Sequence, residues 1–568
     1  MTYDLILRNG TVVDGTGRPR RVADVGVVGD RIVEVAAHAD GGITEAGHQE
    51  IDADGRLVTP GFVDGHTHLD VQLHWDSRLA PSSEHGVTSV VVGNGGLSLA
   101  PCRPTDREAV AALFEGIEDL PVDVTLEAPT WEWETFGEYV AALDRLPTAI
   151  NVGTLVGHAA VRVHAMGERA FDDAPATGDD IDAMVRLVDD AMCAGALGIS
   201  TNRAPMPRLR DGRLAPGVHA AADELLALVA PLAERRAGVV DAAIHLAERD
   251  NATFDRTRAE IALLGEVSRR SGRPVTFGLT HTDRRPDLAT DVLECVRDEN
   301  RLGGCLRPQT PARSIGILFG IETRTPFDRA PSWKELRAAV NGRKMQMVRD
   351  PSFRQTLIKE ADVHGAPVDL DGLYVFPEGE ARYDYLPEHS LNAIATARGV
   401  SPAAAFIELV LETDGALVAN MPFVNQDLSA VAAMLDDPLV LLGLADTGAH
   451  FGQLTDAAQP TFFLSYWIRE RQRWSIEEGV RRLTSDVADL FGLRGRGRLE
   501  PGAYADLNVI DLEALRLGHP EFVTDLPGGG GYVQRAEGYE YTIVNGCVAV
   551  ESGEHVGSPA GRLLTTAD

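Results

Sequence analysis

The fold of this chain is decided by the stretch GFVDGHTHLD, residues 61–70, in which an apolar run ends in His66 and His68. Alternate side chains of a strand lie on one face, so the two imidazoles point the same way. At the end of a strand both can bind one divalent metal ion, for which neutral imidazole is a suitable ligand. A His-x-His pair alone is a weak signal, and the rest of the chain must decide whether this strand ends in a metal site.

From residue 61 to residue 496, apolar β-rich runs alternate with amphipathic helical patterns, as in 179–195 followed by ALGISTN at 196–202. This alternation predicts parallel strands joined by crossover helices. Eight candidate strands end near His68, Asn94, His158, Asn202, His245, His281, Arg307 and Asp446. We predict an α/β fold with a (β/α)8 TIM barrel over 61–496, whose polar strand ends mark the catalytic face. A doubly wound sheet is less favoured, because no Gly-x-Gly-x-x-Gly turn follows the first strand.

The two chain ends have a different texture, with short β-rich runs separated by turn residues, as in LILRNGTVVDGTG at 5–17 and YTIVNGCVAVESGEHVG at 541–557. We predict one small, discontinuous β-sandwich domain formed by residues 1–60 and 497–568.

The interval between the seventh and eighth strands is far too long for a simple connection. We expect a lid-like insertion at about 309–438 that folds over the barrel mouth and sets substrate specificity.

Composition excludes several kinds of partner. The formal net charge of -32 would repel nucleic acids and anionic membranes, so neither is expected to bind. The five cysteines are odd in number and form no C-x-x-C pair, which is typical of a reduced, cytoplasmic protein. No signal-peptide pattern and no apolar run of about 20 residues is present. We expect a cytoplasmic protein that acts on a small molecule, with homo-oligomer formation left open.

Metal-binding residue types recur at the predicted strand ends. His245 and His281 close the fifth and sixth strands, and Asp446 closes the eighth, in GLADTGAH at 443–450. Each histidine taken singly is more often a hydrogen-bonded core residue, but all lie at one predicted face. We predict that His66, His68, His245, His281 and Asp446 converge there as metal ligands.

An ordered set of motifs now carries a family resemblance: GFVDGHTHLD at 61–70, GVTSVVVGNGGLSLAP at 86–101, LVGHAAVR at 155–162, AAIHLAERD at 242–250, GLTHTD at 278–283, GLADTGAH at 443–450 and GRLEPGAYADLNVID at 497–511. Together they resemble the amidohydrolase superfamily and, within it, the D-aminoacylase group of N-acyl-D-amino-acid deacylases. The resemblance implies a metal-dependent hydrolase with one or two zinc ions. By motif, His66 and His68 would hold one ion and His245 and His281 the other. Asp446 would be both ligand and proton carrier.

Two positions depart from that group. Its second-strand motif reads Asn-Cys-Gly with a zinc-binding thiolate, whereas this chain has Gly95 at the cysteine position, and nearby Cys102 is read as a structural thiol. Two places beyond the strand-6 histidine, where a lysine would help hold the substrate carboxylate, stands Asp283. Arg284 or Arg285 could supply that charge, although solvated arginines are an equal alternative. Ser200 and Thr201 occupy the end of strand 4, which excludes a carboxylated lysine there.

Two further histidines follow strand ends. His158, with Arg162, is either a substrate-orienting pair or a packed structural one, and His450 is read as orienting its loop.

Asp446 would take a proton from a metal-activated water and return it to the leaving amine. The function predicted is cleavage of the amide bond of an N-acyl amino acid, with D configuration left open, or of a related small amide. The same metal site used for dehydration, cyclisation or ester hydrolysis, and a metal-depleted binding protein, stay as alternatives.

Overall fold

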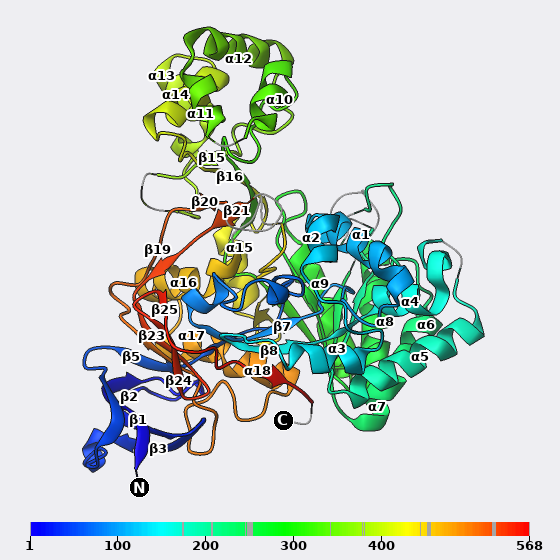
Figure 1. The fold of residues 1–568 in the computed structure, drawn as a ribbon, viewed down its shortest axis with the longest axis vertical. Helices are drawn as coiled ribbons and strands as arrows, with labels where there is room; N and C mark the ends of the chain where they lie inside the picture. Colours follow the sequence, from blue (N-terminus) through cyan, green and yellow to red (C-terminus); the bar gives the residue numbers. More distant parts are fainter. Residues whose placement is uncertain are drawn as a thin grey trace.

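The computed structural model describes most of the chain, namely residues 2–172, 175–205, 208–244, 246, 254–340, 342–377, 379, 381–443, 445–450, 456–524 and 530–566. Its ribbon shows a β-rich region that contains the N-terminus, a larger body of strands and helices, and a helical lobe that projects from one end (Figure 1). The fold is therefore mixed α/β, as the alternating sequence pattern predicts.

Strands from both chain ends pair in one nine-stranded sheet. From the N-terminal side come β1 (Tyr3–Val12), β2 (Arg21–Val28), β3 (Arg31–Ala37), β4 (Gly47–Asp52) and β5 (Leu57–Pro60); from the C-terminal side come β18 (Leu507–Ile510), β23 (Tyr539–Val544), β24 (Cys547–Glu551) and β25 (Glu554–His555). The two halves meet where β5 pairs with β18 in antiparallel register, with Val58 opposite Val509. Both valines belong to a buried apolar cluster drawn from both chain ends, which is the physical reason why the two ends associate.

Two parallel sheets make up the centre of the body. The first runs β26 (Leu563–Leu564), β8 (Asn151–Thr154), β7 (Val87–Val92) and β6 (Phe62–Asp64); the second runs β9 (Val156–Gly157), β10 (Gly198–Asn202), β11 (Val239–Ala243), β12 (Val275–Gly278), β13 (Leu306–Thr310) and β17 (Leu441–Leu442). Only Leu155 separates β8 from β9. At the other end, Thr67 and Thr447 form an isolated parallel bridge. With these contacts, the predicted parallel strands neighbour one another in space in the order in which they occur in the sequence.

Helices lie between consecutive strands and pack outside them (Figure 1). They include α1 (Arg107–Glu118), α2 (Val122–Glu127), α3 (Phe136–Leu143), α4 (His158–Met166), α5 (Gly178–Cys193), α6 (Ala222–Leu228), α7 (Ala230–Arg235), α8 (Phe254–Ser271), α9 (Leu288–Arg301), α15 (Leu428–Leu435), α16 (Gln459–Phe462), α17 (Ile476–Leu483) and α18 (Ser485–Phe491). Sequence sets their limits: α5 begins with a capping box in which Thr177 and Asp180 bond each other's backbone N–H. Its buried positions, including Met184 and Val188, recur at helical spacing.

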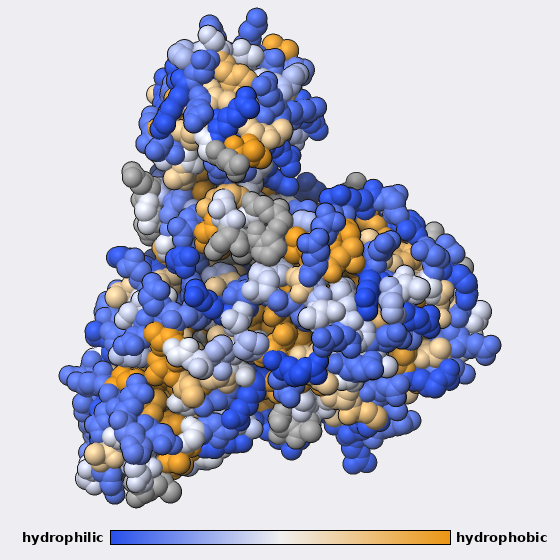
Figure 2. All heavy atoms as spheres, viewed as in Figure 1, coloured by the Kyte–Doolittle hydropathy of each residue, from blue (hydrophilic) through white to orange (hydrophobic). Residues whose placement is uncertain are grey.

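The helical lobe occupies the long interval between β13 and β17. It contains β14 (Ile315–Phe319), α10 (Pro331–Ala338), α11 (Arg343–Arg349), α12 (Pro351–His364), β15 (Tyr374–Val375), α13 (Leu391–Arg398), α14 (Pro402–Glu412) and β16 (Ala419–Val424). A separate apolar core runs from Phe319 to Ala419, and the lobe's visible outer face is mostly hydrophilic (Figure 2). The lobe with its own core therefore covers fewer residues than the predicted insertion at 309–438, because α15 packs against β13 of the body.

Two smaller features complete the architecture. Short hairpins pair β19 (Arg516–Leu517) with β22 (Ala536–Glu537) and β20 (Glu521–Val523) with β21 (Gly531–Val533). Among the helices in the described ranges, none alone has the length and apolar character to span a membrane. Of these helices, only α13 and α14 taken together have that length and apolar character, and the pair is bent by 93°.

Candidate metal centre

His66 and His68 follow β6 and are both buried, with 6% and 7% of their surface exposed. The residue between them fixes their direction. The Thr67 backbone N–H and its hydroxyl both donate to the carbonyl of Val91 on β7, at 3.2 Å and 2.8 Å. These bonds hold Thr67 against β7, and because successive side chains of an extended chain point to opposite faces, the imidazoles of His66 and His68 share one face.

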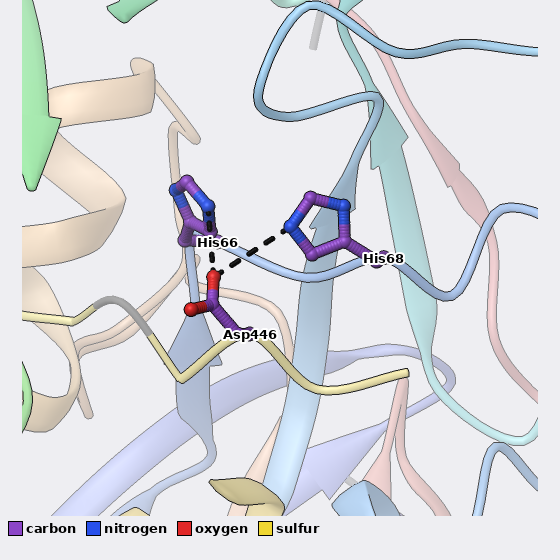
Figure 3. A group of neighbouring side chains, drawn as sticks. All are labelled: His66, His68 and Asp446. Carbon is purple, nitrogen blue, oxygen red and sulfur yellow. Dashed lines mark ion pairs between the residues drawn. The ribbon is translucent and has the colours of Figure 1, made fainter. Parts of the chain in front are cut away.

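Asp446 meets the two histidines from the loop that follows β17. Its Oδ1 lies 3.1 Å from Nε2 of His66 and 3.6 Å from Nε2 of His68, so both imidazoles turn the same nitrogen toward one carboxylate (Figure 3). One ligand atom from each residue lies within 4.8 Å of the other two. Two imidazoles and one carboxylate are a donor set suited to zinc and similar divalent ions, with further positions open. The residues present therefore fit a metal ion.

These side chains open into a cavity of about 270 Å³. Its polar lining includes Glu118, Asn202, Thr280 and His450, and its apolar lining includes Ile117, Ile244 and Leu246. A cavity of this size is at the small end of ligand sites and suits a small molecule. Among the lining residues that the structure describes, none comes from the helical lobe.

Charge around the centre favours a cation. Burial by itself would lower the pKa of His66, but the charges of Asp241 and Asp446 raise it well above its usual value. At His68 burial also acts to lower the pKa, but nearby negative charge, chiefly that of Glu118, outweighs it and raises the pKa. Burial of Asp446 opposes its ionisation, yet its contacts with the two histidines hold the pKa of its carboxyl well below its usual range. Asp446 is consequently ionised at neutral pH and can serve as ligand or proton acceptor.

Two carboxylates that sequence reasoning missed face the other nitrogen of each imidazole. Oδ1 of Asp241, in the middle of β11, lies 3.6 Å from Nδ1 of His66, and Oε1 of Glu118, at the end of α1, lies 3.3 Å from Nδ1 of His68. A charged residue inside the apolar strand VVDAA, 239–243, was a signal that could have found Asp241. Nothing in the sequence around Glu118 distinguishes it from other helix-end acids.

The second pair of predicted ligands is only partly described. His281 is buried just beyond β12, and its Nε2 lies 3.0 Å from Oδ1 of Asp283. Its backbone exchanges two hydrogen bonds with Asn425: the His281 N–H donates to Oδ1 at 2.7 Å, and the Asn425 N–H donates to the His281 carbonyl at 2.8 Å. His281 does not belong to the three-residue ligand group, and His245 lies outside the described residues. Convergence of all five predicted ligands stays a prediction.

None of the proposed substrate residues is among the described residues that line the cavity. His158 is fully buried, and its two ring nitrogens pair with Thr201 at 2.9 Å and Glu224 at 2.9 Å. Arg284 is exposed. Arg285 lies 3.0 Å from Asp291. The role of His158, Arg284 and Arg285 in binding substrate stays a prediction without support from their positions.

Comparison with known proteins now gives the family. Residues 49–377 and 381–550 match the model of an amidohydrolase family. The chain belongs to the amidohydrolase family. It is 30% identical to an uncharacterised protein of Mycobacterium tuberculosis over 90% of this chain and 85% of that one. It is 27% identical to the D-aminoacylase of Alcaligenes xylosoxydans xylosoxydans over 99% of this chain and 97% of the relative.

A solved structure of D-aminoacylase superimposes on this amidohydrolase with a TM-score of 0.66 and 26% identity, covering 99% of this chain and 100% of the other. Another, with a TM-score of 0.65 and 26% identity over the same shares, concerns that enzyme's binuclear metal centre, with activation by one metal and attenuation by the second. The resemblance inferred from the motifs is therefore confirmed at the level of the family and of its D-aminoacylase relatives.

Gly95, which replaces the cysteine of the D-aminoacylase motif at strand 2, has a defined place in this amidohydrolase. Gly95 lines the cavity with a φ of +60°, and a Cβ there would have as its nearest neighbour Cε1 of His68, at 3.6 Å. Its backbone N–H donates to Oδ2 of Asp241 at 3.0 Å. Cys102 is buried in the apolar core, and burial raises the pKa of its thiol to about 12. Cys102 thus stays protonated at neutral pH and does not replace a thiolate ligand.

Proposed function

We propose that this amidohydrolase hydrolyses the amide bond of an N-acyl amino acid or a related small amide at a zinc centre. The observation that carries the proposal is the group of His66, His68 and Asp446, whose ligand atoms lie within 4.8 Å of one another beside a small cavity. The names of the D-aminoacylase and the N-acyl-D-glutamate deacylase, 27% and 28% identical over 99% of this chain, supply the substrate class. D configuration follows from those names alone.

We also propose that the two parallel sheets close into one (β/α)8 barrel. Support comes from both seams: β8 and β9 are separated by Leu155 alone, and the His68 N–H donates to the Thr447 carbonyl at 2.7 Å beside the Thr67–Thr447 bridge. The centre then stands at the C-terminal strand ends, where barrel enzymes carry their catalytic groups. The proposed domains are completed by the β-sandwich of residues 1–60 and 497–568, apart from β26, which pairs with β8 of the body, and by the barrel of 61–496.

The protein's own residues supply the rest of the mechanism. His66, His68 and Asp446 would hold the ion. Zinc held there would lower the pKa of a bound water towards about 7 and polarise the substrate carbonyl. Asp446, whose carboxylate faces both histidines, would accept the proton of the attacking water and return it to the leaving amine. Ile117, Ile244 and Leu246 offer an apolar wall to the acyl group.

The test is a screen of purified zinc-loaded protein against paired N-acyl-D- and N-acyl-L-amino acids, with detection of the free amine. We expect amine release from one series, lowered by about 10²–10⁴-fold in the Asp446→Asn variant, the usual worth of a general acid–base group. Matched acyl esters run beside the amides. Zinc-loaded protein that cleaves esters but releases amine from no amide would overturn amide hydrolysis and favour another reaction at the same centre.

A further inference from the structure

Both imidazoles of the candidate centre are bracketed by carboxylates. Nε2 of each ring faces Asp446, at 3.1 Å and 3.6 Å, while Nδ1 of His66 faces Asp241 at 3.6 Å and Nδ1 of His68 faces Glu118 at 3.3 Å. The three carboxylates come from widely separated parts of the chain. The two outer carboxylates are as enclosed as the rings, with Asp241 fully buried and Glu118 5% exposed. Each histidine therefore has one nitrogen for the ion and one for a carboxylate.

The outer nitrogens lack a hydrogen-bond partner. Nδ1 of His66, Nδ1 of His68 and Oδ1 of Asp241 are buried and make no hydrogen bond within the described ranges, although donors and acceptors stand opposite each other. A neutral imidazole carries one N–H and one lone pair. When Nε2 gives its lone pair to a metal ion, Nδ1 must carry the hydrogen and needs an acceptor. Glu118 and Asp241 stand where those acceptors are required, and a small rotation of each ring would complete the bonds.

A third buried histidine provides a contrast. His158 also faces a carboxylate, Glu224, but its two ring nitrogens are both paired, with Thr201 and with Glu224, each at 2.9 Å. That imidazole has no nitrogen left for an ion. At His66 and His68 the same pairing of histidine with carboxylate leaves Nε2 pointing at Asp446, so the arrangement is specific to the centre.

Hydrogen bonds hold the carboxylate of Asp241 and the backbone of Glu118 in place. Asp241 accepts the backbone N–H of Gly95 at 3.0 Å, and the Glu118 carbonyl accepts the N–H of His450 at 2.8 Å. The first bond joins Asp241 to the strand-2 position where the D-aminoacylase resemblance expects a thiolate. The second joins Glu118 to the loop that carries Asp446. Their two carboxylates lie beside the ligand histidines and add to the negative charge that Asp446 offers a cation.

We propose that Glu118 and Asp241 are positioning residues of the metal centre, each accepting the Nδ1–H of one ligand histidine and directing its Nε2 to the ion. The inference rests on the metal centre of the proposed function. Hydrogen-bonded carboxylates of this kind fix the tautomer and the ring orientation of ligand histidines and raise their basicity, and their loss typically weakens metal binding by about 10–100-fold.

The first experiment measures zinc affinity by competition with a chromophoric chelator, using full-length protein. Asp241→Asn turns an amide N–H toward His66 if its oxygen keeps the Gly95 bond, so we expect zinc to bind about 10–100-fold more weakly. Glu118→Met removes both the hydrogen-bond acceptor and the charge, so we expect the same loss of zinc affinity. Glu118→Gln keeps an acceptor and should fall between Glu118→Met and the wild type. Glu224→Gln, at the contrasting histidine, should bind zinc like the wild type.

The second experiment separates positioning from a general structural role. In the cobalt-substituted protein, each hydrogen-bonded Nδ1–H of a ligand histidine gives a paramagnetically shifted, slowly exchanging proton signal. We expect Asp241→Asn and Glu118→Met each to lose or broaden one signal, and Glu118→Gln to keep both. Asp241→Asn and Glu118→Gln are isosteric, so the lost signal of Asp241→Asn and the weakened zinc binding of Glu118→Gln carry the test even if Glu118→Met does not fold.

The inference is overturned if Asp241→Asn and Glu118→Met bind zinc within about twofold of the wild type, or if Glu224→Gln loses as much affinity as they do. Failure of the proposed function has a different signature. A wild-type protein that binds no zinc, or that binds zinc and releases no amine, refutes that function, whereas unchanged zinc affinity in the variants of a zinc-binding protein refutes only the positioning role.

Discussion

Asp446 has a backbone conformation that most residues avoid, with a φ of +48°, and His450 nearby has a φ of +52°. Aspartate tolerates the left-handed region better than most side chains. Between them lies Gly448, with a φ of +94°, where an added Cβ would meet the carbonyl carbon and oxygen of His68 at 2.8 Å. The loop can present Asp446 to the histidines only because this glycine lets it approach their strand so closely.

We therefore predict that Gly448→Ala damages both stability and metal binding. The matched control is Gly502→Ala, since Gly502 has the same φ of +94° but nothing within 4 Å of its Cβ position. Both variants carry the same backbone strain, and only Gly448→Ala adds a clash with His68. We expect Gly448→Ala to be less stable than Gly502→Ala by about 1–3 kcal/mol. Urea unfolding measures the difference and chelator competition measures zinc affinity; equal behaviour of the two variants would remove the packing explanation.

Gly95 bears on which ion is bound more tightly. Without a thiolate, the site assigned to His281 and His245 retains two neutral imidazoles, whereas His66 and His68 share the anionic Asp446. A carboxylate or thiolate normally supplies the neutralising charge of a zinc site. We predict a metal content of about one ion per chain, lost on His66→Ala and largely kept on His281→Ala, as measured by elemental analysis after dialysis. Metal that survives His66→Ala but not His281→Ala would show that the tight site lies at the second pair.

Some of this centre could be predicted from sequence and some could not. His66, His68 and Asp446 follow apolar strands, so periodicity alone brings them to one face. Glu118 and Asp241 lie beside the rings through tertiary packing, one at a helix end and one within a strand, and no spacing rule relates them to the histidines. A single sequence also gives no sign that both nitrogens of His158 are already paired.

At the scale of elements, the parallel strands were predictable because each is a short apolar run closed by a polar residue. The seventh strand ends later than expected, since β13 continues past Arg307 to Thr310. The strand β26 was placed with the β-sandwich segment, yet Leu563 pairs with Val152 of β8 in the body. A two-residue strand has almost no pattern of its own, and its position depends on the buried Leu564, which packs with Val63 and Val91.

His85 links three segments of the chain and gives a pH-dependent prediction. Its ring nitrogens pair with the Thr461 hydroxyl at 2.7 Å and the Gln534 carbonyl at 2.8 Å, and burial lowers its pKa from 6.5 to about 4. The neutral ring is therefore favoured by folding. Its contribution to stability is complete above pH 6.5 and is lost as the pH falls through 4, because the unfolded chain binds the proton first.

The expected size of this effect is about 3 kcal/mol as an upper bound, because each tenfold change in proton affinity corresponds to about 1.4 kcal/mol. Thermal melting of wild type and His85→Gln between pH 7 and pH 4 measures it. The variant should be less stable at pH 7 and should lose less stability on acidification. His48→Gln, at an exposed histidine, is the control with the wild-type slope; a His85→Gln slope equal to that of the wild type would contradict the assignment.

At the scale of the whole molecule, the helical lobe is joined to the body through a buried contact. Arg313, which precedes β14, lies 2.9 Å from Asp456 and stacks on the ring of Tyr383 at 3.8 Å. Tyr383 belongs to the apolar core of the body, whereas Trp333 belongs to the core of the lobe. Sequence length predicted an insertion here, but only packing shows that most of it has a core of its own.

A separate core predicts that the lobe can lose its structure without loss of the metal centre. Trp333 is 1% exposed, packs against Phe327 and Phe406, and donates from its indole to the Leu357 carbonyl at 2.9 Å. Trp333→Ala should cost about 3–5 kcal/mol within the lobe, which is the usual cost of emptying a buried aromatic site. We expect an early unfolding transition and new proteolytic cleavage confined to the lobe, because cores that share few contacts unfold as separate units.

The matched variant is Phe277→Ala, since Phe277 on β12 is fully buried in the body core, one residue before the cavity-lining Gly278. It should cost a similar free energy but loosen the strands that carry the centre. Zinc affinity, measured at a temperature where both variants keep their far-ultraviolet circular dichroism, should therefore fall in Phe277→Ala and stay near the wild-type value in Trp333→Ala. Parallel loss of zinc in both variants, with one shared unfolding transition, would show that lobe and body form a single cooperative unit.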